Sequence, residues 1–399
     1  MRGRTLSVAV VGGGIGGLAA AASLLRAGID ARVYEQAASL GEIGAGIQIS
    51  PNASRILHGL GLADALAVDG VRPVAVHQRR WDDGRTLQRA PLGPEVEAAF
   101  GSPYYHFHRA DLIAAIASAV PVERVRLGHR FAEMTDHGDR VEARFENGAR
   151  IEADILVGAD GIHSRVRQAL FGPDRPRFTG CVAWRGLVPA ERLRHLDLEV
   201  VSNNWMGPAG HVVHYFVAGG RLVNFVVVKE QDGWTRESWV EPGEVADALA
   251  ALEGWHPRVR EMVGAVDQTF RWALFDRDPL PRWTAGRATL LGDSCHAMLP
   301  FMAQGAAQSI EDGATLAACL RGAADDGDVA GALARYEALR KPRATRLQEM
   351  SRANKIRFHL ADGPEREKRD AQMAQAGDRT IAAMAWLYGH DAARPEAAA

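Results

Sequence analysis

Glycines and acids stand at several points where a predicted strand meets a predicted helix, and these residue types suit the binding of a nucleotide. Gly12, Gly14 and Gly17 follow the apolar stretch 6–11 and precede an alanine-rich stretch that ends at Arg26. A glycine turn of this kind lets the backbone approach a pyrophosphate, which then lies on free N–H groups at the start of a helix. The pattern predicts a bound dinucleotide.

An acid follows the glycine turn at the spacing that a ribose requires. Glu35 ends the second predicted strand, 31–35, and stands 18 residues after Gly17. A carboxylate at this place binds ribose hydroxyls in dinucleotide-binding folds. Gly28 is expected to cap the intervening helix at its C-terminus. A glycine turn without a ligand is the alternative, and the strand, helix and acid around it disfavour that interpretation.

Two further acidic turns occur later in the chain. Asp160 lies in the segment 154–161, where a predicted strand runs into an acidic glycine turn. Asp293 lies in the segment 292–300, again directly after a predicted strand. A helix that begins near Gly305 would direct its positive end at an anion, and a reduced flavin is such an anion. Taken alone, the Asp-Gly pair at 160–161 is equally consistent with an ordinary turn.

In this order and at these separations, the three signatures resemble those of the single-component flavin monooxygenases that hydroxylate aromatic rings. Salicylate, 3-hydroxybenzoate and 6-hydroxynicotinate hydroxylases belong to that group. The resemblance extends from Val8 to about Leu320, with further matches at Arg109, at 184–186 and at 386–391. One departure is that Pro300 is followed by Ala303 and Gly305, whereas many members carry Pro-x-x-Gly-x-Gly.

The resemblance implies tightly but non-covalently bound FAD, with NADH or NADPH and O₂ as co-substrates and no separate nicotinamide domain. It implies oxygen transfer from a flavin C4a-hydroperoxide to the ring of a hydroxybenzoate- or hydroxynicotinate-like acid. Glu35 would hold the adenosine ribose, Asp160 would serve both FAD and the nicotinamide, and Asp293 would contact the ribityl or pyrophosphate region. The implied cofactor-binding residues are Gly12, Gly14, Ile15, Gly17, Glu35, Gln36, Gln48, Arg109, Asp160, Asp293, Gly305 and Ala306.

A base for the substrate's phenol is expected on the predicted hairpin 211–229. Because side chains alternate across a strand, His211 and Tyr215 share one face and His214 lies on the other. A base that takes the phenol proton contributes roughly 10²–10⁴-fold to the rate. We therefore expect His211 to be the base, alone or in a proton relay with Tyr215. If the strand register is flipped, His214 takes that place.

Two alternative functions stay open on the sequence alone. The same oxygenation machinery could act on a larger secondary metabolite or drug. A non-catalytic flavin- or nicotinamide-binding sensor is the more remote alternative. A flavin disulfide reductase is disfavoured because the chain has three cysteines and no C-x-x-C pair.

The elements that must position these residues indicate an α/β fold. Strands and helices alternate up to residue 71 and again from about 288, which is typical of a parallel sheet, whereas 181–275 is rich in strands. We expect a Rossmann-like, three-layer FAD-binding domain with a mostly parallel sheet, an inserted β-sheet substrate domain and C-terminal helices. The expected bounds are 1–71, 101–180 and 276–345 for the FAD-binding domain, 72–100 and 181–275 for the substrate domain, 346–391 for the helical segment and 392–399 for a flexible tail.

The composition of the chain limits the classes of partner that we expect. The formal net charge is −2 and 47% of the residues are hydrophobic, so neither nucleic acid nor an anionic membrane surface is an expected partner. The first apolar run is too short for a signal peptide or a membrane span. We expect a cytoplasmic monomer or homodimer without a metal site, hairpins at 81–85 and 146–148, and a turn at Gly219-Gly220. The arginine-rich stretch 335–352 is expected to form a solvated helix face, and 362–372 a solvated helix or loop.

Overall fold

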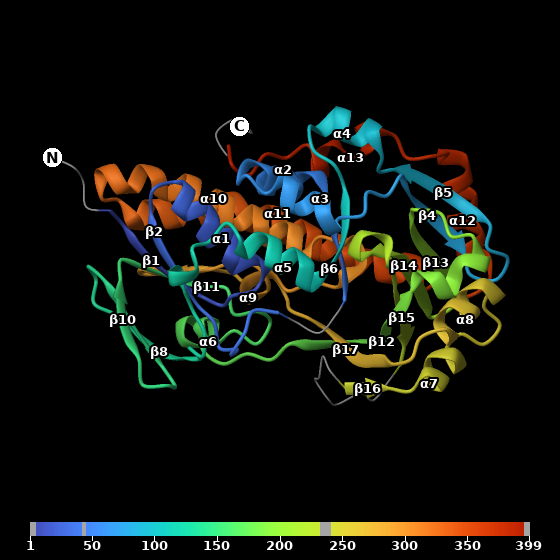
Figure 1. Cartoon of the computed structure of the whole chain (residues 1–399), viewed down its shortest axis with the longest axis horizontal. Coiled ribbons are helices and arrows are strands. Elements are labelled where there is room, and N and C mark those ends of the chain that lie inside the picture. Colours follow the sequence, from blue (N-terminus) through green and yellow to red (C-terminus); the bar gives the residue numbers. More distant parts are fainter. Residues whose placement is uncertain (1–4, 42–44, 232–240, 395–399) are drawn as a thin grey trace.

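The computed structural model describes residues 5–41, 45–231 and 241–394. Its strands form two large sheets, which lie toward opposite ends of an elongated molecule (Figure 1). The expected α/β fold class is confirmed.

The first sheet has six strands and forms the centre of the nucleotide-binding region. Its order is β18 (Thr284–Ala285), β19 (Ala288–Leu290), β11 (Ile155–Gly158), β1 (Ser7–Val11), β2 (Asp30–Tyr34) and β7 (Val125–Arg126). All pairs are parallel except β18 with β19. The central strands β1 and β11 are almost wholly apolar and buried, because layers cover both faces of the sheet.

Those covering layers give the expected three-layer architecture. On one side, helix α1 (Ile15–Arg26) contacts both α5 (Arg109–Ala117) and α10 (Gly305–Asp326). The three-stranded sheet of β8 (Phe131–Asp136), β9 (Val141–Phe145) and β10 (Arg150–Ala153) contacts β1 and β11. Helices α1 and α10 approach closely at Gly313, where an added Cβ would lie 2.7 Å from the Cα of Ala20.

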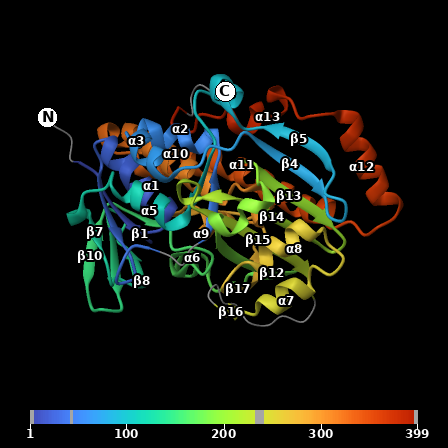
Figure 2. The same ribbon diagram turned by 45° about the vertical axis from the view of Figure 1, so that its right-hand side comes forward.

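The second sheet has eight strands and is mainly antiparallel. Its order is β16 (Glu241–Gly243), β17 (Thr269–Asp276), β12 (Arg177–Pro189), β15 (Leu222–Glu230), β14 (Gly210–Val217), β13 (Ser202–Gly207), β4 (Ala75–Arg80) and β5 (Thr86–Pro91). The segments 72–100 and 181–275 therefore contribute to one sheet. Two helices not expected from the sequence, α7 (Val245–Ala250) and α8 (Pro257–Gly264), pack near this sheet (Figure 2).

Shorter elements connect these layers. They are β3 (Gly46–Ile49), paired with β6 (Tyr105–His108), and the helices α2 (Pro51–Gly59), α3 (Ala63–Asp69), α4 (Pro94–Phe100), α6 (Arg165–Phe171) and α9 (Asp293–His296). The expected hairpins at 81–85 and 146–148 are confirmed, because β4 pairs with β5 and β9 pairs with β10.

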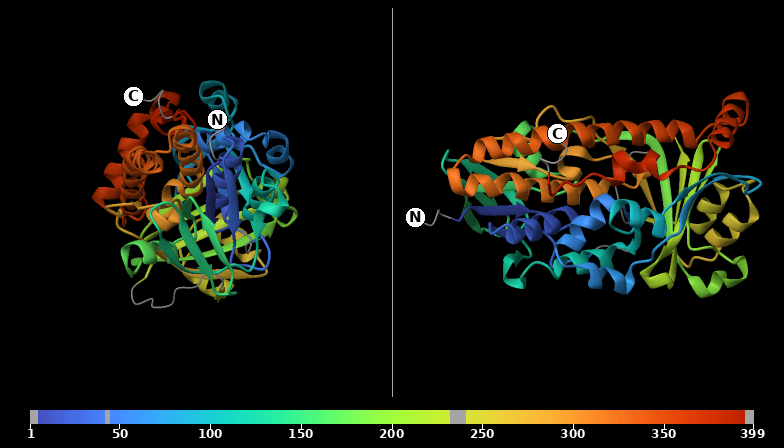
Figure 3. Two further views of the ribbon diagram at one scale, coloured as in Figure 1. Left: turned by 90° about the vertical axis from the view of Figure 1, so that its left-hand side faces the viewer. Right: turned by 90° about the horizontal axis from the view of Figure 1, so that it is seen from above.

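The C-terminal region is helical and runs along the whole molecule. Helix α11 (Val329–Phe358) extends from the first sheet toward the second and is followed by α12 (Pro364–Ala376) and α13 (Ile381–Tyr388) (Figure 3). The expected boundary between 345 and 346 falls inside α11, which is one continuous helix. Among the described residues, no helix has the length and apolarity needed to cross a membrane.

A buried ionic network joins α10 to α11. Arg340 donates to Asp312 Oδ1 over 2.8 Å and to Glu311 Oε2 over 2.5 Å, while Arg343 binds both oxygens of Glu311. The expectation of a solvated face over 335–352 is therefore wrong at Arg340 and Arg343, which are 1% and 8% exposed. The acids of α10 compensate the cost of burying these cations.

The network also keeps its acids ionised. Burial opposes ionisation of Glu311, but the cations of Arg340 and Arg343 outweigh it and lower its pKa to about 2. Burial likewise opposes ionisation of Asp312, whose pKa His296 and Arg340 lower to about 2. Because the pKa values of Glu311 and Asp312 are depressed in the folded protein, these acids stabilise the fold at pH values above about 4, the pKa of an unfolded acid. That contribution is lost as pH falls toward 2.

Three other expectations are corrected. The connection between β14 and β15 spans 218–221 rather than two residues, because Ala218, Gly219 and Gly220 all have positive φ and Val217 pairs with Leu222. The segment 362–372 is not wholly solvated, since α12 buries Arg366, Arg369 and Asp370. Of the expected tail, Ala392 is buried and its carbonyl accepts a hydrogen bond from Thr315, while 395–399 lie outside the described residues.

We expect Arg340→Leu to lower the free energy of unfolding by about 3–5 kcal/mol, because it leaves Glu311 and Asp312 buried without their shared cation. Arg321→Leu is the matched control, since Arg321 lies exposed on α10. The two variants are compared with the wild type by urea unfolding at pH 7. Equal stability of both variants would contradict the role given to the network.

Candidate functional site

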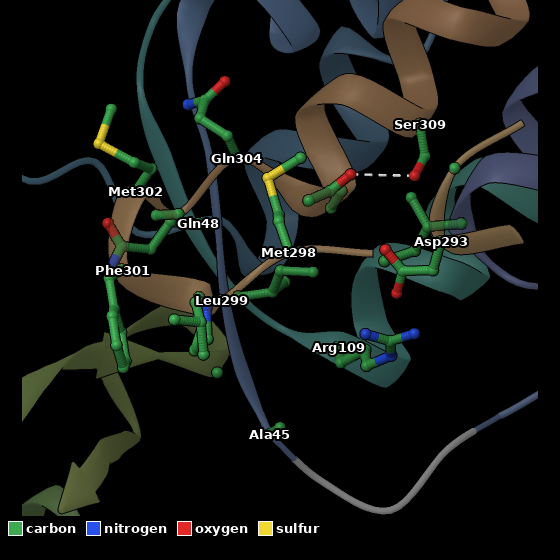
Figure 4. Close-up of a pocket in the computed structure, with 18 of the residues that line it drawn as sticks. Ala45, Gln48, Arg109, Asp293, Met298, Leu299, Phe301, Met302, Gln304 and Ser309 are labelled. Atoms are coloured by element: carbon green, nitrogen blue, oxygen red, sulfur yellow. Dashed lines mark hydrogen bonds between the residues drawn. The ribbon is translucent and has the colours of Figure 1, made fainter. Parts of the chain in front are cut away.

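Residues of both sheets and of the C-terminal helices line one continuous cavity of about 1020 Å³. Figure 4 shows Arg109, Asp293 and Ser309 at one end of it and Phe301 and Met302 at the other. The segment 298–306, which precedes and opens α10, forms one wall. All twelve residues expected to bind the cofactor line this cavity except Gly17, which lies behind the glycine turn.

The glycine turn forms for the reasons the sequence suggested. Gly12 has φ of +113°, and a Cβ there would lie 2.3 Å from the carbonyl oxygen of Ala159. A Cβ at Gly17 would lie 1.9 Å from the carbonyl oxygen of Gly12, so only glycine permits this approach of helix and strand. At Gly14, by contrast, an added Cβ meets no atom within 4 Å. Gly14 therefore faces open cavity at the start of α1.

Two helices, α1 and α10, begin at the cavity with neither a described capping side chain nor an acid in their own first turn. Ile15, Gly305 and Ala306 line the cavity at these ends. The free N–H groups and the helix dipoles make both ends favourable for negatively charged ligand groups.

The three expected acids differ in how their carboxylates are used. Glu35 accepts the N–H of Gly13 over 2.6 Å and that of Ala37 over 2.8 Å, so it orders the glycine turn as well as lining the cavity. Asp160 accepts the N–H groups at the start of α6, including that of Arg165 over 2.7 Å. Asp293 is exposed to the cavity, and no described residue donates a hydrogen bond to its side chain.

The β14–β15 pair forms the opposite wall. His211, Val213 and Tyr215 of β14 line the cavity, together with Val226 and Val228 of β15. His214 lies on the other face of β14, where its ring stacks on Trp205 with 6.3 Å between centroids. Burial and the nearby Arg79 lower the pKa of His214 to about 3.

His211 is buried and has a polar partner that the sequence did not indicate. Its Nδ1 lies 2.7 Å from Nε2 of His359, which follows the last residue of α11. Nδ1 of His359 lies 2.9 Å from Oε1 of Glu230, the last residue of β15. Burial, the main cause, and the neighbouring His359, the second, hold the pKa of His211 well below its usual value. The imidazole is therefore neutral at pH 7.

Tyr215 has different neighbours from His211. Its ring packs on that of His106, with 4.4 Å between centroids, and no described hydrogen bond joins it to His211. Burial raises the pKa of Tyr215, and the Gln48 side chain and Arg185 oppose this only in part. Gln48 accepts a hydrogen bond from the Tyr104 hydroxyl over 2.7 Å. Tyr215 therefore offers a neutral hydroxyl to the cavity rather than a base.

Positive charge gathers on the part of the cavity formed by β5 and the C-terminal helices. Arg89, Arg357 and Arg379 line it, and no described carboxylate pairs with their guanidinium groups. Burial and the positive charges of Arg379 and Arg369 lower the pKa of Arg357. Such a cluster is short of negative charge, and an anionic ligand would supply it.

The C-terminal segment that lines the cavity is attached through its main chain. Arg55 of α2 donates to the carbonyl oxygens of Tyr388 and His390 over 3.2 and 2.9 Å. Arg343 of α11 donates to those of Trp386 and Leu387 over 3.1 and 2.9 Å. Side chains of the same segment, among them Met384 and Leu387, are thereby left to line the cavity.

Sequence reasoning missed His359, Glu230 and Arg357. His359 and Glu230 lie 148 and 19 positions from His211 and belong to no local motif. Arg357 lies between the two charged stretches, 335–352 and 362–372, that the sequence predicts to be solvated. The predicted hairpin 211–229 ends one residue before Glu230, which is the only signal that this residue lies at that end of the sheet.

The FAD binding domain family matches residues 5–351 of the chain. A 3-amino-4-hydroxybenzoate 2-monooxygenase of Streptomyces platensis is 46% identical over 97% of this chain and 96% of its own. A 6-hydroxynicotinate 3-monooxygenase of Pseudomonas fluorescens is 39% identical over 87% and 90%. Among solved structures, Klebsiella pneumoniae HpxO complexed with FAD and uric acid is similar with a TM-score of 0.83, 28% identity and 94% coverage of each chain.

We expect Gly14→Val to leave the fold intact and to abolish cofactor retention, because its side chain would enter open cavity where the pyrophosphate is expected. Gly17→Val is the contrasting variant, since its Cβ would collide with the Gly12 carbonyl and destabilise the protein itself. Flavin absorbance after gel filtration and the melting temperature separate the two effects. Full flavin retention by Gly14→Val would contradict this position for the pyrophosphate.

Proposed function

The chain belongs to the FAD binding domain family of aromatic-ring monooxygenases, and on that premise we propose that it hydroxylates a small hydroxylated aromatic acid with NAD(P)H and O₂. One observation carries the proposal: a single cavity joins the glycine turn at Gly14 to the wall that holds His211 and Tyr215. Its volume, about 1020 Å³, is at the upper end of the range for small-molecule sites. That volume suits a dinucleotide together with one small ring.

The residues present fit FAD. The uncapped first turn of α1 would hold the pyrophosphate, and the open space at Gly14 admits it. Glu35 would hold the adenosine ribose, and the unpartnered carboxylate of Asp293 would accept hydroxyl groups of the ribityl chain. The start of α10 would stabilise negative charge on the reduced ring. When bound, FAD supplies hydride uptake from NAD(P)H and the activation of O₂.

His211 is suited to act as the base in this proposal. Its neutral imidazole can accept the proton of the substrate's ring hydroxyl, and the resulting oxyanion makes the ring a better nucleophile. Such a base contributes about 10²–10⁴-fold to the rate. The neutral hydroxyl of Tyr215, four residues along the same strand face, would orient the ring by a hydrogen bond. The apolar residues Leu299, Phe301 and Val228 would exclude water from the ring.

The substrate class proposed is an aminohydroxybenzoate or a close hydroxybenzoate. The 46% identical Streptomyces platensis relative, named for 3-amino-4-hydroxybenzoate, supports this choice. The arginines at 89, 357 and 379 support an acid, because a carboxylate would pair with their uncompensated charge. A cytoplasmic location, where NAD(P)H is available and the three buried cysteines stay reduced, belongs to the same proposal.

The proposal is tested by adding hydroxybenzoates, aminohydroxybenzoates and 6-hydroxynicotinate to the FAD-loaded protein and measuring NADH and NADPH oxidation. We expect an aminohydroxybenzoate to stimulate oxidation and to yield a singly hydroxylated product. If no aromatic acid stimulates oxidation, the assignment fails and a flavin-binding sensor becomes the better interpretation.

We expect His211→Gln to lower the yield of hydroxylated product per NAD(P)H at least 10-fold while FAD stays bound, because the ring hydroxyl loses its base. His214→Gln is the matched control: the same substitution three residues away, on the other face of β14, leaves the cavity face unchanged. Product and consumed NAD(P)H are quantified together. Equal coupling in the two variants would refute the base assignment.

We expect Arg357→Met to raise KM for the aromatic acid about 10–100-fold with a smaller change in kcat, which corresponds to about 1.5–3 kcal/mol for a lost charged hydrogen bond. The corresponding primary amide, which carries no charge, serves as the comparison substrate. If the variant discriminates acid from amide as strongly as the wild type does, Arg357 has no part in binding the carboxylate.

A further inference from the structure

We propose that His359 and Glu230 form a relay that fixes the tautomer of His211 and carries the proton of the substrate's ring hydroxyl to solvent. The inference deepens the proposed function and rests on it for the substrate step. The three side chains come from β14, from the end of α11 and from the end of β15. The side chain of His359 is 2% exposed and that of Glu230 is 40% exposed, so the chain of contacts leads from the interior to the surface.

The tautomers of His211 and His359 follow from the Glu230 carboxylate, which is the acceptor at the solvent end of the relay. A carboxylate only accepts hydrogen bonds, so Nδ1 of His359 must carry the proton that Glu230 receives. A neutral imidazole has one N–H group, which leaves Nε2 of His359 as an acceptor. Nδ1 of His211, 2.7 Å away, must then be the donor. Nε2 of His211 is left with a lone pair, and no described residue hydrogen-bonds to it.

The main chain holds the relay in place. The N–H of Ala209, which precedes β14, donates to the carbonyl oxygen of His359 over 3.0 Å, and the N–H of Glu230 donates to the carbonyl oxygen of Ala209 over 2.8 Å. The rings of Phe301 and Phe358 lie edge-on to His211, with 4.6 and 5.4 Å between centroids. Water is therefore kept from the inner contact.

Proton transfer along this chain balances without an oxidant or a reductant. The ring O–H gives its proton to Nε2 of His211, and Nδ1–H of His211 gives its own to Nε2 of His359. Nδ1–H of His359 then protonates the Glu230 carboxylate, which releases the proton to water. The net result is one proton moved from substrate to solvent. The same transfers in reverse return a proton to the ring oxygen and restore the starting tautomers.

Other charged groups near the relay do not replace Glu230 as the acceptor. Nζ of Lys355 lies 3.8 Å from Glu230 and donates to the carbonyl oxygen of Thr179. Lys355 and Lys229 both disfavour a positive charge on His359, whose pKa burial already lowers. The thiol of Cys181 is also adjacent, but burial raises its pKa to about 11, so it stays protonated.

The tautomers are measured in the FAD-loaded protein without substrate, by ¹⁵N NMR of labelled histidine at pH 7. His211→Gln and His359→Gln assign the two sets of signals. We expect Nδ1–H, Nε2-bare tautomers at both positions, and loss of that preference at His359 in Glu230→Gln. A bare Nδ1 at His211 would overturn the relay whether or not the protein hydroxylates any ring.

The substrate step is measured as kcat against pH with 3-amino-4-hydroxybenzoate and as ultraviolet absorbance of the bound phenolate. We expect Glu230→Gln and His359→Gln to lower kcat at pH 7 about 10–100-fold. In both variants the bound phenol should ionise at higher pH, with KM changed less than 3-fold. Glu230→Asp should recover part of the activity, and Glu253→Gln, at an exposed acid elsewhere in the same region, should behave as the wild type.

The two measurements separate the two proposals. If wild-type protein hydroxylates the ring and His211→Gln impairs it, but Glu230→Gln keeps the wild-type pH profile, the relay is overturned and the proposed function stands. If the predicted tautomers are found and no aromatic acid is hydroxylated, the proposed function fails. In that case the proton step of the relay fails with it.

Discussion

The pair of adjacent carboxylates inside α10 is the interaction on which the arrangement of the site depends. Asp312 accepts the N–H of Gly292 over 2.8 Å and lies 2.7 Å from Nε2 of His296, so it holds both ends of the turn that presents Asp293. Glu311 accepts hydrogen bonds from Asn52 of α2 and from Arg343 of α11. The start of α10, the acidic turn and the two longest helices are thus fixed by one set of buried charges, and the cavity wall at 298–306 lies between them.

Local features of the fold could be predicted because each depends on neighbours in the chain. The glycine turn at Gly12 follows from the backbone conformation and the close contact with α1 that only glycine allows. That His211 and Tyr215 share one face of β14, opposite to His214, follows from the twofold alternation of the strand, whereas which face meets the cavity depends on packing. The parallel sheet follows from alternating strands and helices. The glycine turn of the cofactor signature is detectable for the same reason, since it lies within a single strand, turn and helix.

Features that depend on distant partners could not be predicted. Arg340 and Arg343 have the spacing of a solvated helix face, and only the acids 28 to 32 residues earlier on α10 make their burial possible. The pairing of His211 with His359 spans 148 positions and has no trace in either local sequence. Helix α11 is continuous across the expected boundary at 345/346, and its C-terminal half contacts the second sheet through distant partners, as Arg352 does with Asp276.

The segment 386–390 is held by hydrogen bonds to its main-chain carbonyl oxygens. Arg55 and Arg343 donate to these oxygens, which every residue type possesses, so the hydrogen bonds themselves do not depend on the side chains of the segment. The side chains of Trp386 and Tyr388 add ring contacts with Arg343 and Phe100, whereas Leu387 lines the cavity and can be exchanged without removing these hydrogen bonds. A scaffold built in this way can acquire new ring preferences by single substitutions while FAD binding and the buried charge network stay as they are.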